Sequence, residues 1–477
     1  MGDTDGSTAG LIVTTSAGAV RGTARDGTIA FLGIPYAAPP IGPAAFQAPA
    51  PPPAWDGVRD ATAYGPTAPQ VGYPAPIAAL LDNDIELGDD YLTVNVWTRD
   101  PSASGLPVMV WIHGGAFARG SNRLPMYAGD SFARDGVVFV SVNYRLGVPG
   151  FASVDGAPEN RGLLDQLAAL RWVRDNVEAF GGDPGQVTVF GESAGAMSVA
   201  SLLSSPLATG LIHRAIMQSG NATAAVAVSD ARKVTARVAG LLGVGADAAG
   251  LGSVSAALLL QAQTDVALEL TLNPDPEIFG ATVVAVGMGI MSTMPVVDGE
   301  VLPNLPIASI ASQSSGIPLI TGWNADEFRF FLVPTGVAAM ATPEFARGMI
   351  GGIDGAVEQF DEHVTAGTSP GDALCMVLTD IAFRAGSLKL ARLRPTEPTY
   401  LYEFGVPNNE AGIGAAHAVE IPYVFDHLAV ARRLTGPDAP QAVADVMHSA
   451  WVAFAKTGDP GWAAYLPNET VYRFGLD

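Results

Sequence analysis

Residues 187–198 read Val187-Thr-Val-Phe-Gly-Glu-Ser193-Ala-Gly-Ala-Met-Ser198. A run of β-branched and aromatic residues, typical of a strand, leads into Gly-x-Ser-x-Gly, and small residues that favour a helix follow. This order predicts a sharp strand-to-helix turn that holds Ser193 in a strained backbone conformation with its hydroxyl exposed. Gly191 and Gly195 leave room for neighbouring backbone, so a β-carbon at either position is expected to clash. Ser193 is therefore the candidate nucleophile.

The composition indicates a globular chain with a large interior. Hydrophobic residues make up 48% of the 477 residues and charged residues 15%, against about 25% charged in an average chain. The net charge of −22 disfavours nucleic acid and anionic membranes as partners, because both repel an acidic surface. The N-terminal residues lack the basic and apolar regions of a secretory signal, and Cys375 is the single cysteine. A cytoplasmic location is expected, and the oligomeric state is left open.

Strand-like and helix-like segments alternate from Tyr91 onwards. Strands are predicted at 92–97, 108–113, 137–144, 187–190, 317–321 and 400–404, and a helix at 163–179. Their Val, Ile and Leu runs predict an α/β fold with a mostly parallel central sheet and helices on both faces. Residues 11–32 predict a small antiparallel sheet, and 225–295 and 333–395 predict helical insertions that cap the active-site face. We expect one domain over residues 1–477.

Chain order restricts the base that could activate Ser193. After a serine in such a turn, the acid and then the histidine follow along the chain. Of the six histidines, His417 lies after the serine in a Gly-rich loop that follows a predicted strand. His427 and His448 lie in apparent helices, which favours a structural role for both. His417 is therefore the candidate base, which a carboxylate must orient.

The partners of Ser193 and His417 should follow two other predicted strands. Asp326 and Glu327 come just after 317–321, and spacing does not separate them; Asp298 is a more distant third choice. Gly114-Gly115-Ala116 follows 108–113 and offers small residues that let backbone approach a ligand. We expect this loop to complete an oxyanion hole with the N–H of Ala194, because an acyl-transfer intermediate needs such donors.

Several longer motifs resemble those of the type-B carboxylesterases, a family of α/β-hydrolase fold that includes the cholinesterases and bacterial para-nitrobenzyl esterases. They are His113-Gly-Gly-Ala-Phe117, Asn143-Tyr-Arg-Leu-Gly147, Gly162-Leu-Leu-Asp-Gln166, Ala179-Phe-Gly-Gly-Asp-Pro184, Gly191-Glu-Ser-Ala-Gly195, Gln218-Ser-Gly220, Asp326-Glu327 and His417-Ala-Val-Glu-Ile-Pro-Tyr-Val-Phe425. The resemblance implies Glu327 as the triad acid, His417 as the base, and Gly115, Ala116 and Ala194 as oxyanion donors. It also implies that Glu192, Ser219 and Glu420 support them.

The chain departs from that family at three places. The N-terminal cysteine pair of many members maps to Ala68 and Tyr91, so that disulfide is absent. The segment 69–90 contains no tryptophan, so cation–π recognition of choline is not expected. Phe328 replaces the glycine that usually follows the acid. The residues expected to line the substrate pocket are Phe117, Met288, Met291, Trp323 and Phe328.

These features together predict a serine carboxylesterase without metal or organic cofactor. It should hydrolyse neutral, fairly apolar small-molecule esters through an acyl-enzyme intermediate. A carbamate or amide hydrolase, or an acyltransferase, would use the same triad and stays an alternative. A non-catalytic recognition protein is less favoured, because Ser193, Glu327 and His417 are all present.

Overall fold

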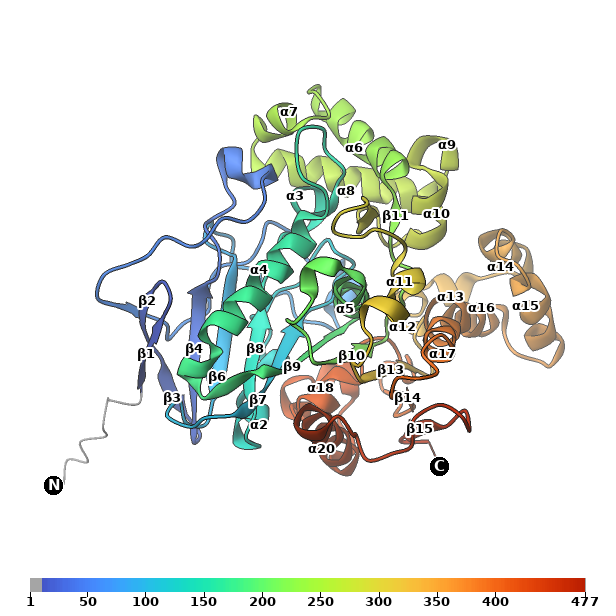
Figure 1. Ribbon diagram of the computed structural model, residues 1–477. Helices are drawn as coiled ribbons and strands as arrows, with labels where there is room; N and C mark the ends of the chain where they lie inside the picture. The colour runs from blue at the N-terminus through green and yellow to red at the C-terminus, as the bar shows by residue number, and fades with distance from the viewer. Residues whose placement is uncertain (1–10, 477) are drawn as a thin grey trace.

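The computed structural model describes residues 11–476, and a ten-stranded sheet runs through its centre (Figure 1). The strand order is β15-β14-β13-β10-β9-β7-β8-β6-β4-β3. The strands are β3 (Thr23–Arg25), β4 (Thr28–Pro35), β6 (Thr93–Thr98), β7 (Leu106–Ile112), β8 (Val138–Val142), β9 (Gly182–Glu192), β10 (Arg214–Gln218), β13 (Leu319–Asn324), β14 (Thr399–Phe404) and β15 (Val471–Phe474). From β8 to β15 all neighbours are parallel, and β3, β4 and β6 are antiparallel. The prediction of a mostly parallel sheet is confirmed.

The N-terminal strands differ from the prediction for residues 11–32. Strands β1 (Ile12–Thr15) and β2 (Gly18–Arg21) pair antiparallel, and β5 (Val58–Asp60) joins β2 in parallel to complete a small three-stranded sheet. Strands β3 and β4 instead extend the central sheet. The reason is burial: β4 is buried along most of its length and suits the interior of a large sheet, whereas alternate residues of β1 are exposed.

Helices cover both faces of the sheet, as predicted. On β7 and β9, Val110 and Val189 belong to the core that includes α4 (Arg161–Asn176) and α5 (Ala194–Ser204). Their neighbours Trp111 and Phe190 point the other way, into the core that includes α20 (Gln441–Thr457). Strands buried on both faces explain the continuous apolar runs in the sequence.

Two further groups of helices lie outside the sheet layers, one at the top and one at the right of Figure 1. The first is α6 (Val228–Leu242), α7 (Ala248–Gly252), α8 (Ala256–Leu272), α9 (Pro276–Phe279) and α10 (Ala281–Gly287). The second is α13 (Val337–Met340), α14 (Pro343–Ile350), α15 (Ala356–Thr365), α16 (Pro370–Thr379) and α17 (Ala385–Arg392). The remaining helices are α1 (Ala75–Ala78), α2 (Asp130–Arg134), α3 (Gly147–Phe151), α11 (Pro306–Gln313), α12 (Arg329–Leu332), α18 (Ile421–Val424) and α19 (Arg432–Thr435). A separate two-stranded sheet consists of β11 (Val226–Ala227) and β12 (Val296–Val297). Within residues 11–476 no helix is both long and apolar enough to cross a bilayer.

Candidate active site

Ser193 lies at the junction of β9 and α5, in the turn that the sequence predicts. Its φ of 54° and ψ of −124° are strained for a residue with a side chain. A β-carbon on Gly191 would lie 2.6 Å from both the carbonyl oxygen of Ile112 and the carbonyl carbon of Gly195. One on Gly195 would lie 2.9 Å from the carbonyl carbon of Ile112. The predicted clashes are therefore confirmed, and they arise from close packing of α5 against the end of β7.

His417 and Glu327 meet at the end of the sheet. The imidazole Nδ1 lies 2.6 Å from Glu327 Oε2, and both side chains are buried. The other carboxylate oxygen of Glu327 accepts a hydrogen bond of 2.8 Å from the backbone N–H of Asn324. A carboxylate at Nδ1 fixes the ring tautomer so that Nε2 is the nitrogen free to exchange a proton.

The neighbouring carboxylate of Asp326 has a different contact. Its Oδ2 accepts from the backbone N–H of Ala415 at 2.9 Å, and its own N–H donates to the Ala415 carbonyl at 3.0 Å. Asp326 therefore holds the loop that carries His417 in place through these two hydrogen bonds. Asp298 accepts from the N–H of Leu302 in a separate turn. Of the three carboxylates that spacing left open, the one bonded to the imidazole is that of Glu327.

The other histidines weighed in the sequence lie in structural settings. His448 is on α20, and its ring contacts the Val424 carbonyl at 2.7 Å and Asp135 at 3.1 Å. His427 lies just before a 3-10 turn, so its assignment to a helix was wrong, and its ring pairs with Asp130 at 3.1 Å.

Glu192 lies on the opposite edge of the His417 ring. Its Oε1 is 3.0 Å from Nε2, but the two are not aligned as a hydrogen bond. Within residues 11–476 no hydrogen bond joins the Ser193 hydroxyl to His417, and catalytic hydrogen bonds often tighten only when substrate is bound. Burial lowers the pKa of His417, but the charges of Glu192 and Glu327 oppose it and raise that pKa to about 9. Burial raises the pKa of Glu192 to about 8. The imidazole and the Glu192 carboxyl therefore compete for a proton.

A buried polar network supports Glu327 from behind. Asn324, whose N–H binds Glu327, donates through its side chain to Glu420 Oε2 at 2.6 Å. Gln218 donates to Glu420 Oε1 at 3.1 Å and accepts from the indole of Trp451 at 3.1 Å. Glu420 is thus connected to Glu327 through Asn324. Burial raises the pKa of Glu420 to about 7.

The sequence reasoning missed three members of this network. Asn324, Gln218 and Trp451 come from three distant parts of the chain. The sequence offered a signal for two of them: Asn324 lies at a strand end, and Gln218 opens the motif Gln218-Ser-Gly220. Ser219 was expected to support the histidine. Its backbone N–H donates to the Gly322 carbonyl at 3.0 Å, while its buried hydroxyl has no partner within residues 11–476.

The loop after β7 packs directly against the Ser193 turn. A β-carbon on Gly114 would lie 2.6 Å from Glu192 Oε2 and 3.1 Å from the β-carbon of Ser193. Gly115 and Ala116 have φ values of 111° and 56°, and within the described chain neither N–H donates to a protein acceptor. The N–H of Ala194 begins α5, where the first helical donors have no partner inside the helix. The loop that carries Gly115 and Ala116 therefore lies beside the turn that carries Ser193 and Ala194.

The model of the carboxylesterase family matches residues 9–351 and 352–472. The chain belongs to the carboxylesterase family. It is 39% identical to phenmedipham hydrolase of Pseudarthrobacter oxydans, and this match covers 94% of this chain and 90% of the relative. It is 38% identical to para-nitrobenzyl esterase of Bacillus subtilis, and this match covers 95% of this chain and 92% of the relative. The crystal structure of a Geobacillus stearothermophilus carboxylesterase matches with a TM-score of 0.82 at 35% identity. This match covers 97% of this chain and 96% of that chain. The chain is thus a serine carboxylesterase with an α/β-hydrolase fold, acting on small-molecule esters.

The pocket residues expected for this carboxylesterase lie in several places. Phe117 is fully buried against Phe151 at 4.7 Å. Trp323 and Phe328 belong to one buried cluster, Met288 packs on its edge, and Met291 belongs to the main core.

The aromatic rings closest to the His417 imidazole belong to residues outside this expected set. Phe331 and Phe383 lie 5.2 Å and 5.1 Å from it, between ring centroids. Phe383 was missed by the sequence reasoning. It lies on a π-helical turn, Asp380–Arg384, and such turns often occur at functional sites.

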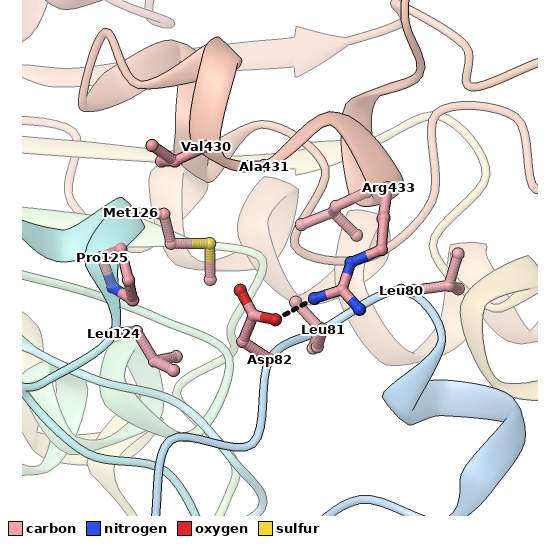
Figure 2. Close-up of a pocket in the computed structure, with 10 residues that line it drawn as sticks. Leu80, Leu81, Asp82, Leu124, Pro125, Met126, Val430, Ala431 and Arg433 are labelled. Carbon is pink, nitrogen blue, oxygen red and sulfur yellow. Dashed lines mark hydrogen bonds and ion pairs between the residues drawn. The ribbon is translucent and has the colours of Figure 1, made fainter.

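A separate pocket of the carboxylesterase lies between residues 80–82, which follow α1, the turn Pro125–Tyr127 and α19 (Figure 2). Asp82 and Arg433 form an ion pair across it, and its other lining residues are mostly apolar. None of the lining residues belongs to the site around Ser193, so this pocket is not the ester site. Among residues 11–476 no three His, Cys, Asp or Glu side chains are grouped as a metal site.

Proposed function

We propose that Ser193, His417 and Glu327 form the catalytic triad of this carboxylesterase. The observation that carries the proposal is the 2.6 Å contact between His417 Nδ1 and Glu327 beside a strained serine turn. A carboxylate in that position stabilises the imidazolium that forms when the histidine takes a proton.

The reaction then follows in two halves. His417 Nε2 takes the proton of the Ser193 hydroxyl as the oxygen attacks the ester carbonyl carbon. The N–H groups of Gly115, Ala116 and Ala194 stabilise the oxyanion, each contributing about 10²–10³ in rate. The imidazolium gives its proton to the leaving alcohol, and an acyl-enzyme forms on Ser193. A water molecule, deprotonated by Nε2, hydrolyses this ester and releases the carboxylic acid.

The surroundings of His417 support neutral, fairly apolar esters as substrates. Phe331 and Phe383 lie against the imidazole, and Phe328 packs on both rings at 5.3 Å and 6.1 Å. We also propose a cytoplasmic location, supported by the buried single cysteine Cys375, and no nucleic-acid or membrane partner, supported by the net charge of −22.

The test is a panel of para-nitrophenyl esters of rising acyl length, with one carbamate and one anilide, assayed on the wild type and Ser193→Ala. We expect ester turnover to exceed carbamate and anilide turnover, and Ser193→Ala to lose about a thousandfold or more in kcat while its circular dichroism is unchanged. Retention of more than a few per cent of activity in the folded variant would refute the mechanism. Faster turnover of the carbamate or the anilide would favour the alternative reaction.

A further inference from the structure

His113 follows β7 and begins the loop that carries Gly115 and Ala116. Its side chain is buried, and its Nδ1 lies 2.8 Å from the carbonyl oxygen of Gly114. Burial lowers the pKa of His113 to about 4, so the ring is neutral at neutral pH and carries one N–H. A carbonyl can only accept a hydrogen bond, so that hydrogen is on Nδ1 and His113 donates to Gly114.

Two neighbours hold the imidazole of His113 in place. The ring of Tyr144 stacks on it, with 4.5 Å between the ring centroids and 21° between the ring planes, and the Tyr144 hydroxyl donates to the His113 carbonyl at 2.8 Å. Gly120 closes over the contact, because a β-carbon there would lie 2.5 Å from both His113 Nδ1 and the Gly114 carbonyl oxygen. The backbone N–H of Gly120 in turn donates to the Gln70 side chain at 2.8 Å. The Nδ1–H of His113 therefore keeps a fixed direction toward Gly114.

This hydrogen bond sets the direction of the peptide between Gly114 and Gly115. The peptide is trans, so its C=O and its N–H point in opposite directions. Because the Gly114 carbonyl points toward His113, the N–H of Gly115 points away from it. The next peptide is fixed by backbone instead, since the Gly115 carbonyl accepts from the N–H of Ala118 at 3.1 Å, which sets the direction of the Ala116 N–H. Within residues 11–476 the imidazole is the one hydrogen-bond donor to the Gly114 carbonyl, so the direction of the Gly115 N–H depends on a side chain.

We propose that His113 is a positioning residue, which holds the Gly115 N–H toward the oxyanion through the Gly114 carbonyl. This inference rests on the proposed function and adds a residue that transfers no proton itself. Without the imidazole N–H, the buried Gly114 carbonyl would lose its partner, and the peptide would turn to find another. The Gly115 N–H would then turn away from the oxyanion. The transition state would lose a donor, whereas the bound ester would lose little, because its carbonyl oxygen carries less charge.

The experiment compares His113→Asn with His113→Leu. The amide nitrogen of asparagine follows Cγ as the imidazole Nδ1 does, so His113→Asn keeps a donor for Gly114. Leucine has nearly the same shape and no donor. The control pair is His448→Asn and His448→Leu, because Nδ1 of the buried His448 contacts the Val424 carbonyl at 2.7 Å on α20, outside the ester site.

Two measurements separate positioning from a general loss of structure. The first is kcat and KM for para-nitrophenyl butyrate. The second is Ki for an alkyl trifluoromethyl ketone. The Ser193 oxygen bonds to the carbonyl carbon of this inhibitor, His417 takes the serine proton, and the ketone oxygen becomes an oxyanion like that of the reaction. Circular dichroism and Tm report whether each variant is folded.

Complete loss of one oxyanion donor costs about 10²–10³ in rate, and His113→Leu displaces the donor without removing it, so we expect kcat to fall by about 10- to 100-fold. Ki for the ketone should rise by the same factor, while KM stays within about threefold of the wild type. His113→Asn should regain about tenfold or more, and both His448 variants should keep kcat and Ki within about threefold of the wild type.

An unchanged Ki in His113→Leu, or equal losses in His113→Asn and His113→Leu, would overturn the proposal. Should His113→Leu not fold, His113→Gln takes its place in the same comparison, because its amide lies where the imidazole Nε2 does and not at Nδ1. Full activity of Ser193→Ala would instead refute the proposed function, whatever the His113 variants do.

Discussion

At the scale of single residues, two adjacent carboxylates have different contacts. Glu327 bonds the imidazole of His417, and Asp326 bonds the backbone of Ala415. We expect Glu327→Gln to lower kcat by about 10³–10⁴-fold, because an amide cannot stabilise the imidazolium. Asp326→Asn keeps an oxygen for the Ala415 N–H and should stay within about threefold of the wild type. Turnover of para-nitrophenyl butyrate measures both, and an inactive Asp326→Asn beside an active Glu327→Gln would reverse the assignment.

The pH dependence of activity follows from the carboxylates around His417. An unperturbed histidine has a pKa of about 6.5, but Glu192 and Glu327 raise the pKa of His417 to about 9. The base acts in its neutral form, so activity should rise with pH as the imidazole loses its proton. In Glu192→Gln the pKa of His417 should fall, and the acidic limb of kcat/KM should move to lower pH.

Profiles of kcat/KM between about pH 5 and 10 for both proteins test this prediction, and an unmoved or upward-shifted limb would contradict it. Because the folded pKa is raised, His417 should stabilise the fold below about pH 6.5, and this contribution is lost as pH rises through about 9.

At the scale of elements, close packing of β9 and α5 creates the serine turn. A β-carbon on Gly191 would lie 2.6 Å from backbone atoms of Ile112 and Gly195, neither of which can move without shifting a strand or helix. We expect Gly191→Ala to lower the free energy of unfolding by about 1–3 kcal/mol. Gly240 on α6 has open space around it, so Gly240→Ala should raise that free energy by up to about 1 kcal/mol. Urea unfolding measures both, and equal stability of Gly191→Ala and the wild type would refute the packing argument.

The burial of each strand decides whether its sequence pattern can be recognised. Strands β7, β8 and β13 are almost wholly buried, so their apolar runs were visible in the sequence. Strand β10 is short and starts with Arg214, and β15 is half exposed at the sheet edge, so neither has a clear pattern. The turn and its histidine were predictable because local glycine motifs mark them. The network through Asn324, Gln218 and Trp451 was not, because long-range contacts leave no local periodicity.

At the scale of the whole molecule, one buried ion pair connects distant segments. Arg145, after β8, pairs with Asp165 on α4 at 2.6 Å, and neither side chain is exposed to solvent. The same guanidinium donates to the carbonyls of Ala45 and Gln47 at 3.1 Å and 2.6 Å. Asp165→Asn would leave a buried cation uncompensated, so we expect the free energy of unfolding to fall by about 3–5 kcal/mol.

The control for this pair is Glu269→Gln, which breaks the solvent-exposed pair with Arg237 and should cost less than about 1 kcal/mol. Urea unfolding of both variants gives the comparison, and similar losses in the two would show that Arg145 and Asp165 do not connect the segments as described.

The proposed mechanism requires Ser193 to form the covalent intermediate. Its most direct test is to inactivate the enzyme with diethyl para-nitrophenyl phosphate, which phosphorylates an activated serine and releases para-nitrophenol, and to map the adduct by tandem mass spectrometry. We expect one diethylphosphoryl group per chain, on Ser193, in proportion to the activity lost. Complete inactivation with Ser193 unmodified, or with the adduct on another residue, would contradict it.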